Sequence, residues 1–306
     1  MRDTEYCVIV NPAAAGGKAR RKWPALEKKL TAAGVRLRVF DAEQYGDCET
    51  PAREGFEQGL RHFIAVGGDG TANGVINGVL PLCPDDETQI TLGVVPWGTG
   101  NDWANFHGLS GEMEDCVKLM AEGVVRHQDI GRVAYTNTAG DRATHYFLNM
   151  AGTGFDTHLL DAMGPTKGSR LRYLWTLLRV YRSYRAAAVT AHLEGETLTL
   201  SPLLFEVCLG SYIGAGMLIA PDADGSDGLF DILAIEQMST WKMLRSLKYL
   251  YNGDIDAHPA THARRCDSLT VDGNSQRFFQ CDGELVGTLP INIDLLPLRL
   301  RILSPP

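Results

Sequence analysis

Residues 66–73, Val-Gly-Gly-Asp-Gly-Thr-Ala-Asn, constrain the fold of this chain more than any other stretch. They close the apolar run 62–66, which is predicted to be a buried strand, with three glycines around one carboxylate. Glycine reaches backbone angles that other residues avoid and has no Cβ, so consecutive N–H groups can turn inward toward phosphate oxygens. We therefore expect a strand that ends in a phosphate-binding turn.

Two further strands are predicted to end in similar turns. The apolar run 90–95 leads into Gly98-Thr99-Gly100-Asn101-Asp102, and the run 6–10 leads into Asn11 and then Gly16-Gly17-Lys18. In open α/β sheets, ligands bind outside the carboxyl ends of the strands. The three turns are therefore expected at one edge of a sheet, where they would bind a nucleotide, although each turn taken alone could be an ordinary tight loop.

Other phosphate-binding motifs are absent from these turns. Ala19 follows Gly16-Gly17-Lys18 where a P-loop needs a hydroxyl for Mg²⁺, and Pro12 stands where a P-loop has its first glycine. Neither Gly68-Asp69-Gly70 nor Gly98-Thr99-Gly100 is completed by a third glycine at Rossmann or protein-kinase spacing. The sequence thus argues against P-loop enzymes, Rossmann dehydrogenases and protein kinases.

The order of predicted elements indicates two domains. A helix over 24–30, with Pro24 in its first turn, is followed by a strand over 35–40, a helix over 50–59 and the strand 62–66, which is α/β order. From Gly131 onward, runs rich in β-branched and aromatic residues predict a mainly β domain. These runs are 133–135, 144–150, 188–193, 197–200, 203–209 and 289–303.

Composition restricts the partners and the compartment. The 306 residues, 44% hydrophobic, suffice for two cores, and the net charge of −8 argues against a general nucleic-acid binder. The seven cysteines lack metal-binding spacing and are predicted to be reduced thiols. No signal peptide is predicted, because the N-terminus lacks an apolar core. No membrane span is predicted, because the most apolar stretch, 203–221, is interrupted by Glu206 and several glycines. We expect a cytoplasmic protein.

Several motifs together resemble the bacterial diacylglycerol/lipid kinase family of the DAGK catalytic domain type. The resemblance rests first on two glycine motifs, Gly67-Gly68-Asp69-Gly70-Thr71 and Gly98-Thr99-Gly100-Asn101-Asp102. Asn11-Pro12, the segments 147–156 and 220–231, and Cys281-Asp282-Gly283-Glu284 are also similar to that family, in the same order. The chain departs from the family at Phe40, near a usual threonine, and at Ala13-Ala14-Ala15, where relatives carry serine.

The resemblance implies a fold and an activity. The fold is an α/β N-terminal domain with a nucleotide-binding sheet, over residues 1–130 and completed by 297–306, plus a mainly β, sandwich-like C-terminal domain over 131–296. The activity is that of an ATP-dependent lipid kinase, which transfers the γ-phosphate to the hydroxyl of a lipid such as diacylglycerol. An enzyme similar to NAD kinase and a non-catalytic lipid or nucleotide sensor remain alternatives, and the identity of the lipid is open.

The ATP site is expected on the glycine turns, with the catalytic Mg²⁺ oriented by Asp69 or Asp102 through oxygen ligands. Asp102 could instead be a helix N-cap, since aspartate is favoured there. The predicted ATP-binding residues are Asn11, Gly16, Gly17, Gly67, Gly68, Asp69, Gly70, Thr71, Thr99 and Asn101.

Glu284 is implied as the proton acceptor, with Asp282 beside it. A carboxylate within hydrogen-bond reach can remove the proton of a lipid hydroxyl as the new bond forms. On local sequence alone, Asp282-Gly283-Glu284 could be merely a turn, because Asp-Gly is a common turn pair.

A second Mg²⁺ site is implied in the loop Asp224-Gly225-Ser226-Asp227-Gly228-Leu229. Its ligands would be the Asp227 side chain and the backbone carbonyls of Asp224 and Leu229, since Mg²⁺ prefers oxygen. An aspartate-rich hairpin without metal is the alternative.

A basic segment is expected to contact lipid. Residues 162–193 contain no acidic residue, and their cations alternate with apolar and aromatic side chains, as in helices that lie on anionic headgroups. The cations are Lys167, Arg170, Arg172, Arg179, Arg182 and Arg185. An ordinary surface helix has similar periodicity. The expected partners are therefore ATP, a lipid alcohol and, peripherally, an anionic membrane surface, without nucleic acid; a homodimer is compatible with the sequence.

Overall fold

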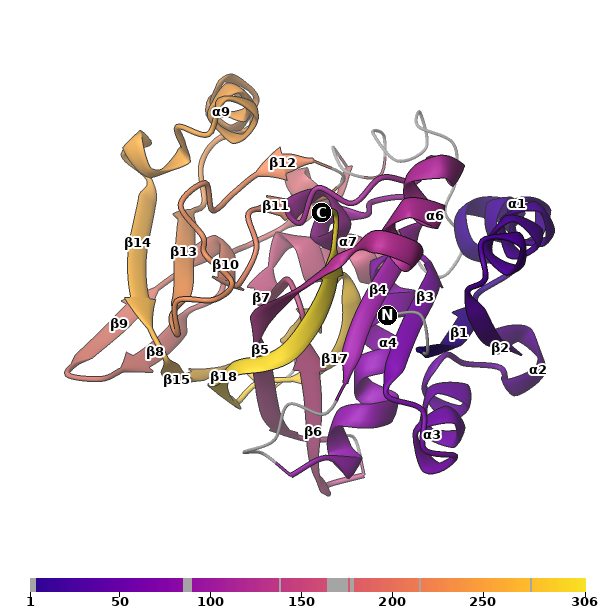
Figure 1. Cartoon of the computed structure of the whole chain (residues 1–306). Helices are drawn as coiled ribbons and strands as arrows, with labels where there is room; N and C mark the ends of the chain where they lie inside the picture. The colour runs from indigo at the N-terminus through magenta and orange to yellow at the C-terminus, as the bar shows by residue number, and fades with distance from the viewer. Residues whose placement is uncertain are drawn as a thin grey trace. The chain divides into compact units, whose positions relative to one another are not determined.

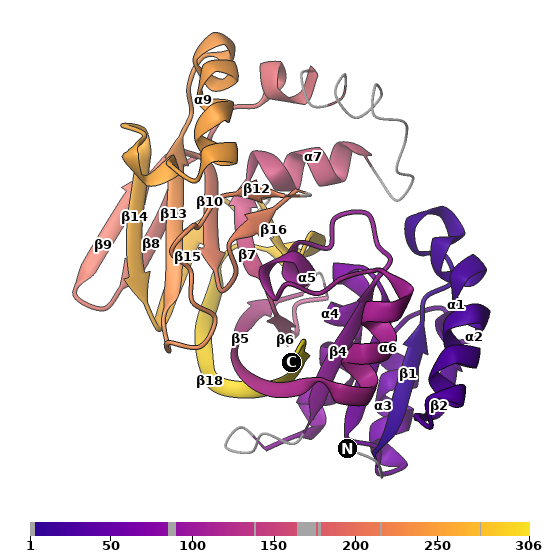
Figure 2. The same cartoon turned by 45° about the horizontal axis from the view of Figure 1, so that its top comes forward.

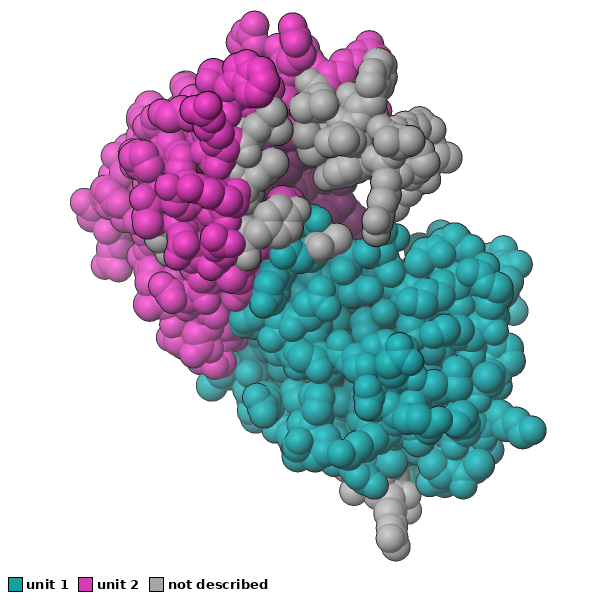
Figure 3. Space-filling model, turned by 90° about the horizontal axis from the view of Figure 1, so that it is seen from above, with its two compact units in different colours: residues 1–130, 212–216, 296–306 teal, residues 131–211, 217–295 magenta. Residues whose placement is uncertain are grey.

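The computed structural model describes residues 4–84, 90–137, 139–163, 176, 179–214, 216–275 and 277–306. The chain divides into two compact units, which Figure 3 shows in different colours. Unit 1 comprises residues 1–130, 212–216 and 296–306, and unit 2 comprises residues 131–211 and 217–295. Each unit has its own core, and the two are described separately.

Unit 1 is built on a parallel sheet. Its strands lie in the order β2 (Arg36–Asp41), β1 (Glu5–Val10), β3 (His62–Gly67), β4 (Thr91–Pro96) and the second half of β18 (Ile291–Ser304). Burial of β1, β3 and β4 is nearly complete, as their continuous apolar sequences require in a sheet covered on both faces. The carboxyl ends of β1, β3 and β4 therefore lie together.

Helices cover both faces of this sheet (Figure 1). Helices α1 (Ala14–Ala32) and α6 (Met113–Glu122) pack together, as do α3 (Glu49–Glu57) and α4 (Asp69–Val79). Right-handed crossovers place the two pairs on opposite faces, because the strand order reverses after β2. The remaining elements are short: α2 (Ala42–Tyr45), η1 (Leu80–Leu82), α5 (Asp102–Phe106), β11 (Tyr212–Ile213) and the first half of β5 (Val124–Thr136).

The first helix differs from its prediction. Pro24 lies inside α1 and not in its first turn, because regular helix already follows the left-handed residues 15–17. Ala19 and Trp23 are buried in this earlier stretch. Their burial stabilises helical turns that the missing N–H of proline alone would disfavour.

Unit 2 is a sandwich of two antiparallel sheets (Figure 2). One sheet contains β15 (Ser268–Gly273) between the first half of β18 and β8 (Val189–Leu193), followed by β9 (Glu196–Leu200), with β5 and β6 (Arg142–Phe147) joined at β18. The other has the order β14 (Thr261–Cys266), β13 (Phe230–Glu236), β10 (Pro202–Cys208), β7 (Met150–Gly154), β16 (Phe278–Cys281), β17 (Glu284–Thr288).

Apolar side chains from both sheets fill the sandwich. Phe147 of one sheet stacks on Phe230 of the other with 5.7 Å between ring centroids, and Phe205, Val271 and Ile293 pack in the same cluster. This arrangement confirms the predicted fold class: an α/β domain with a parallel sheet and a mainly β, sandwich-like domain.

Helices α7 (Phe155–Met163), α9 (Thr240–Asn252) and η2 (Ile255–Ala257) of unit 2 lie outside the sandwich, as does the short strand β12 (Met217–Leu218). Of the predicted basic segment, Lys167, Arg170 and Arg172 lie outside the described residues, whereas Arg179 and Arg182 are exposed. Within the described part of the chain, no helix combines the length and the apolar character needed to cross a bilayer.

Candidate functional site

Two glycine turns of unit 1 are in direct backbone contact. A Cβ on Gly98 would lie 2.3 Å from the Cα of Gly68, and a Cβ on Gly68 would lie 2.9 Å from the Cα of Gly98. Real Cβ contacts are not this short, so only glycine lets the turns after β3 and β4 approach so closely. The sequence predicted that these turns share one sheet edge, and in the structure they touch.

Asp69 links the same two turns through hydrogen bonds. Its Oδ2 accepts the N–H of Asp102 at 3.1 Å, and its Oδ1 accepts the N–H of Trp103 at 3.2 Å. These amides begin α5 and have no partner within that helix. Asp69 thus stabilises the start of α5 from the neighbouring turn.

The alternative interpretation of Asp102 as an N-cap is wrong. Asn101 occupies the cap position with φ 58°, and Asp102 is the first residue of the helix. The Asn101 Oδ1 instead accepts the N–H of Gly98 at 2.9 Å and so closes its own turn. This leaves the Asp102 carboxylate to bind elsewhere, and its Oδ1 accepts the N–H of Gly216 at 2.8 Å.

The carboxylates of Asp69 and Asp102 converge beside Gly100. The position that a Cβ of Gly100 would occupy lies 3.2 Å from the Oδ2 atoms of both residues. Asp102 is only 8% exposed. Two carboxylates that face one position give a hard, negatively charged donor set of the kind that Mg²⁺ prefers.

Asn11 joins the first turn to the second. Its Nδ2 donates to Thr71 Oγ1 at 3.1 Å, and its backbone N–H donates to Val66 O at 3.0 Å. A Cβ on Gly67 would lie 2.1 Å from Thr71 Oγ1, so only glycine at this position leaves room for the hydroxyl. Gly70 lies in the first turn of α4, and Thr99 is exposed between β4 and α5.

The loop after β1 has a left-handed backbone. Ala15, Gly16 and Gly17 have φ of 46°, 64° and 84°, whereas Ala13, two residues before Ala15, has a right-handed backbone. Such a change of hand can turn successive N–H groups toward an anion. The Arg21 guanidinium donates to Gly16 O at 3.1 Å, which adds a positive charge to this loop.

In unit 2, Asp282 anchors the hairpin that carries Glu284. Asp282 and Gly283 join β16 to β17 with φ of 49° and 84°, the backbone of a two-residue hairpin turn. The Asp282 carboxylate accepts three backbone N–H groups, at 2.8 Å from Leu148, 2.9 Å from Asn149 and 3.1 Å from Met150. Glu284, at the start of β17, is exposed.

Gln280 anchors the same hairpin from the other side. Its Oε1 accepts the N–H of Gly283 at 2.8 Å, and its Nε2 donates to Glu206 Oε2 at 3.1 Å. Glu206 is fully buried on β10, and a Cβ on Gly152 of β7 would lie 2.0 Å from its Oε2. Gly152, part of the segment 147–156, therefore makes room for Glu206.

A second buried carboxyl, Asp156, lies beside Glu206. Burial first, and then the charge of Asp156, raises the pKa of Glu206 well above its ordinary value. Burial also raises the pKa of Asp156, to about 6. Two ionised carboxylates can only accept, whereas a proton held by Glu206 gives it an O–H that donates to Asp156. These surroundings therefore favour a proton shared within the pair.

Sequence reasoning did not identify Glu206, Asp156 or Gln280 as parts of the site. The available signal was Glu206 itself, a charged residue within the otherwise apolar strand 203–209. Charged side chains are almost never fully buried without partners. The sequence could not show which residues those partners were.

The acidic loop of unit 2 is structured by its own aspartates. Asp224 Oδ1 accepts the N–H and the hydroxyl of Ser226 at 3.0 and 2.7 Å, and Asp227 Oδ1 accepts the N–H of Leu229 at 3.1 Å. The other oxygen of Asp227 pairs with the Arg265 guanidinium, which also lies 3.2 Å from Asp231 Oδ1. A carboxylate has about four lone-pair sites, so Asp227 keeps acceptor capacity beside these two contacts.

Family comparisons cover both units. Residues 5–133 match the diacylglycerol kinase catalytic domain, and residues 151–304 match the YegS C-terminal NAD kinase beta sandwich-like domain. The second match alone extends over half of the chain.

Individual relatives of this chain agree with the family matches. The chain is 26% identical to a diacylglycerol kinase of Staphylococcus saprophyticus, over 97% of this chain and 94% of the relative. It is 27% identical to a diacylglycerol kinase of Bacillus subtilis, over 97% and 95%. A crystal structure of a candidate diacylglycerol kinase from Bacillus anthracis has the same fold, with a TM-score of 0.77, 21% identity and coverage of 99% of this chain and 96% of that chain.

Proposed function

The chain belongs to the bacterial diacylglycerol/lipid kinase family, and on that premise we propose that it transfers the γ-phosphate of ATP to the hydroxyl of a lipid, diacylglycerol being the first candidate. The observation that carries the proposal is the hairpin of Glu284, held by Asp282 on one side and Gln280 on the other. Phosphoryl transfer depends mainly on positioning and charge, and a base must be held in a fixed place.

We assign ATP binding to the glycine turns of unit 1. The turns at Gly68 and Gly98 approach each other closely, and no neighbouring atom lies within 4 Å of the position that a Cβ on Gly16 would occupy, so a phosphate can approach the backbone of the loop there. Asn11, Thr71 and Asn101 support these turns through their side chains. In this proposal residues 1–130 with 297–306 form the ATP-binding domain, and residues 131–296 form the lipid-substrate domain.

Glu284 is the proposed general base. Its side chain is exposed, whereas the carboxylate of Asp282 already accepts three backbone N–H groups. Asp282 is therefore a positioning residue, and Glu284 takes the proton from the lipid hydroxyl as the oxygen attacks phosphorus. The leaving oxygen departs with ADP.

Asp69 and Asp102 are the proposed holders of the catalytic Mg²⁺, which would neutralise developing charge on the transferred phosphoryl group. Their Oδ2 atoms converge beside Gly100, which supports the assignment. Asp227 with the backbone carbonyls of Asp224 and Leu229 is the proposed second, structural site. Both carboxylates there already order the loop.

Peripheral contact with an anionic membrane is part of the proposal, because a diacylglycerol substrate resides in a bilayer. The exposed Arg179 and Arg182 support such contact.

The proposal is tested with radiolabelled ATP and a panel of lipid alcohols in mixed micelles. We expect a phosphorylated lipid product from the wild type. Glu284→Gln is expected to keep ATP binding and the melting temperature but to lose transfer by about 100-fold or more, the usual contribution of a general base. Near-normal turnover in this variant would reject Glu284, and no product from any lipid would reject the lipid kinase.

A further inference from the structure

Helix α9 of unit 2 presents an unusual combination of exposed side chains. Trp241 is 77% exposed at its start, and Lys242, Arg245 and Lys248 follow at intervals of three residues, all exposed. Residues three apart share one side of a helix. No acidic residue occurs between Gln237 and Gly253, so this face is purely cationic.

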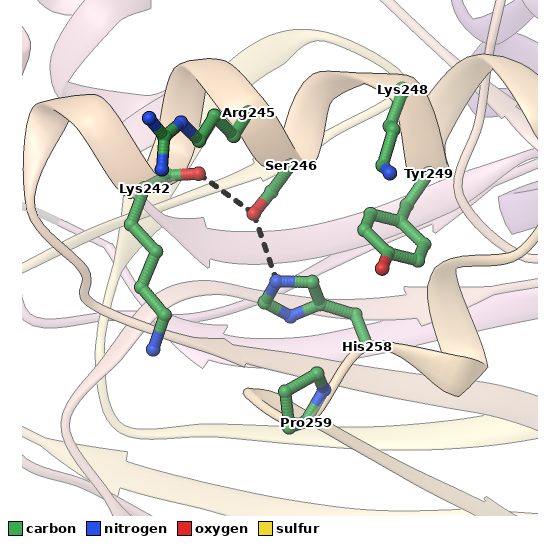
Figure 4. A pocket seen from close by; sticks show the side chains of 7 residues that line it. All are labelled: Lys242, Arg245, Ser246, Lys248, Tyr249, His258 and Pro259. Carbon is green, nitrogen blue, oxygen red and sulfur yellow. Dashed lines mark hydrogen bonds between the residues drawn. The ribbon is translucent and has the colours of Figure 1, made fainter.

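The cations surround a hollow. Lys242, Arg245, Ser246, Lys248, Tyr249, His258 and Pro259 line a pocket of about 410 Å³. Figure 4 shows Lys242 and Arg245 toward one end, Lys248 with Tyr249 toward the other, and Ser246 above His258 between them. Among the described residues, none of the three cations has a carboxylate partner within ion-pair distance.

The floor of the pocket is fixed by hydrogen bonds. His258 is 5% exposed, and its Nδ1 accepts the N–H of Ala260 at 3.2 Å, so the proton of the neutral ring is on Nε2. That nitrogen lies 2.8 Å from Ser246 Oγ, which donates to Lys242 O at 2.8 Å. The Tyr249 ring stands edge-on to His258 at 5.1 Å.

The opposite side of α9 anchors it to the unit. Met243 is buried in a cluster with Phe155, Leu159, Tyr181 and Leu203. Ser239 caps the start of the helix, and Gly253 ends it with φ 78°. Because one side is held in place, the cations and Trp241 stay directed outward.

We propose that α9 docks on an anionic phospholipid bilayer, with a headgroup phosphate in the pocket among Lys242, Arg245 and Lys248 and with Trp241 in the interface. Exposed tryptophan is favoured at the headgroup level of a bilayer, and each cation near an anionic surface adds attraction. The proposal rests on the proposed function and assigns residues of α9 to the membrane contact that this function calls for. The test of this proposal measures membrane binding alone. The docking site can therefore be rejected while the kinase assignment stands, and the kinase assignment can be rejected while the docking site stands.

The experiment is vesicle sedimentation of the full chain with phosphatidylcholine vesicles that do or do not contain phosphatidylglycerol. Wild type is expected to bind only the anionic vesicles, with partitioning that falls as salt is added. Replacing Lys242, Arg245 and Lys248 together by Gln is expected to weaken partitioning by ~100-fold, from the attraction of three cations. Trp241→Ala weakens it at constant charge.

The matched control replaces the exposed cations Lys28, Arg36 and Arg53 of unit 1 by Gln, which changes the net charge equally. It is expected to bind as wild type does. Equal losses in the two triple variants would overturn the proposal in favour of general charge attraction. Equal binding to neutral vesicles, or displacement from anionic vesicles by dissolved glycerol phosphate, which would mark a site for a free phosphate, would also overturn it.

Discussion

The amide of Gln280 donates to the buried carboxyl of Glu206 at 3.1 Å while its oxygen accepts the N–H of Gly283. One side chain thereby links a fully buried acid to the turn that precedes Glu284. The link gives the interior of the sandwich a direct effect on the proposed catalytic hairpin. An amide suits this position because it donates and accepts at once.

The Asp156–Glu206 pair should make stability depend on pH. Burial raises both pKa values, that of Asp156 to about 6 and that of Glu206 well above its ordinary value, so the folded protein binds more protons than the unfolded chain above about pH 4. The contribution of the protonated pair to the free energy of unfolding is therefore fully present below about pH 4. It is lost as pH rises through the pKa values of the folded state.

Glu206→Gln removes one of these titrations and keeps the hydrogen bonds. We expect its melting temperature to fall less than that of the wild type between about pH 5 and 7, measured by calorimetry. Asp254→Asn, which changes an exposed carboxylate, is the control. A slope identical to that of the wild type would contradict the shared-proton interpretation.

Asp282→Asn tests whether Asp282 positions the hairpin. Asparagine offers one oxygen to three N–H groups and places its own NH₂ against the others, which costs about 1–3 kcal/mol. We expect a melting temperature lower by roughly 2–10 °C, together with lower kcat. Glu284→Gln, in contrast, lowers kcat alone, and an unchanged melting temperature in Asp282→Asn would argue against anchoring.

Gly98→Ala tests the contact of the two glycine turns. Its Cβ would meet the Cα of Gly68 at 2.3 Å, and backbone cannot rotate away as a side chain can. We expect a loss of about 2 kcal/mol or more and ATP binding weaker by ~10-fold, measured by calorimetric titration. Thr99→Ala alters an exposed neighbour and should leave stability within about 0.5 kcal/mol.

Asp227→Asn tests the proposed structural Mg²⁺. Added Mg²⁺ is expected to raise the melting temperature of the wild type, because an ion that binds only the folded state stabilises it. The variant should lose most of this gain, whereas the exposed Asp254→Asn should retain it. A wild type that does not respond to Mg²⁺, or a variant that responds fully, would reject the site.

Local signals in the sequence predicted the parts of the site that depend on local backbone. Glycines after apolar runs located the turns of β1, β3 and β4, and Asp-Gly indicated the hairpin turn. The partners of Asp69 and Asp282 were not predictable in this way. Asp69 binds amides about 33 positions later, and Asp282 binds amides more than 130 positions earlier.

Fold class was predictable because short apolar runs alternate with helical segments before Gly131, whereas runs rich in β-branched and aromatic residues follow it. Glu206 was harder. Its neighbours Gly152 and Gln280 come from two other strands, β7 and β16, and only strand order brings them together. Pairing of distant strands is not encoded in any short window of sequence.

The parallel pairing of Arg301 and Ile302 with Thr91 and Leu92 has a consequence for biosynthesis. During translation, β4 emerges long before its partner and presents an open edge with unpaired amides until β18 is made. The nucleotide-binding sheet is therefore finished only after the whole sandwich sequence has left the ribosome. A newly made chain should therefore complete its proposed ATP-binding sheet only after unit 2 has been synthesised, and chaperones can bind the exposed edge of β4 until then.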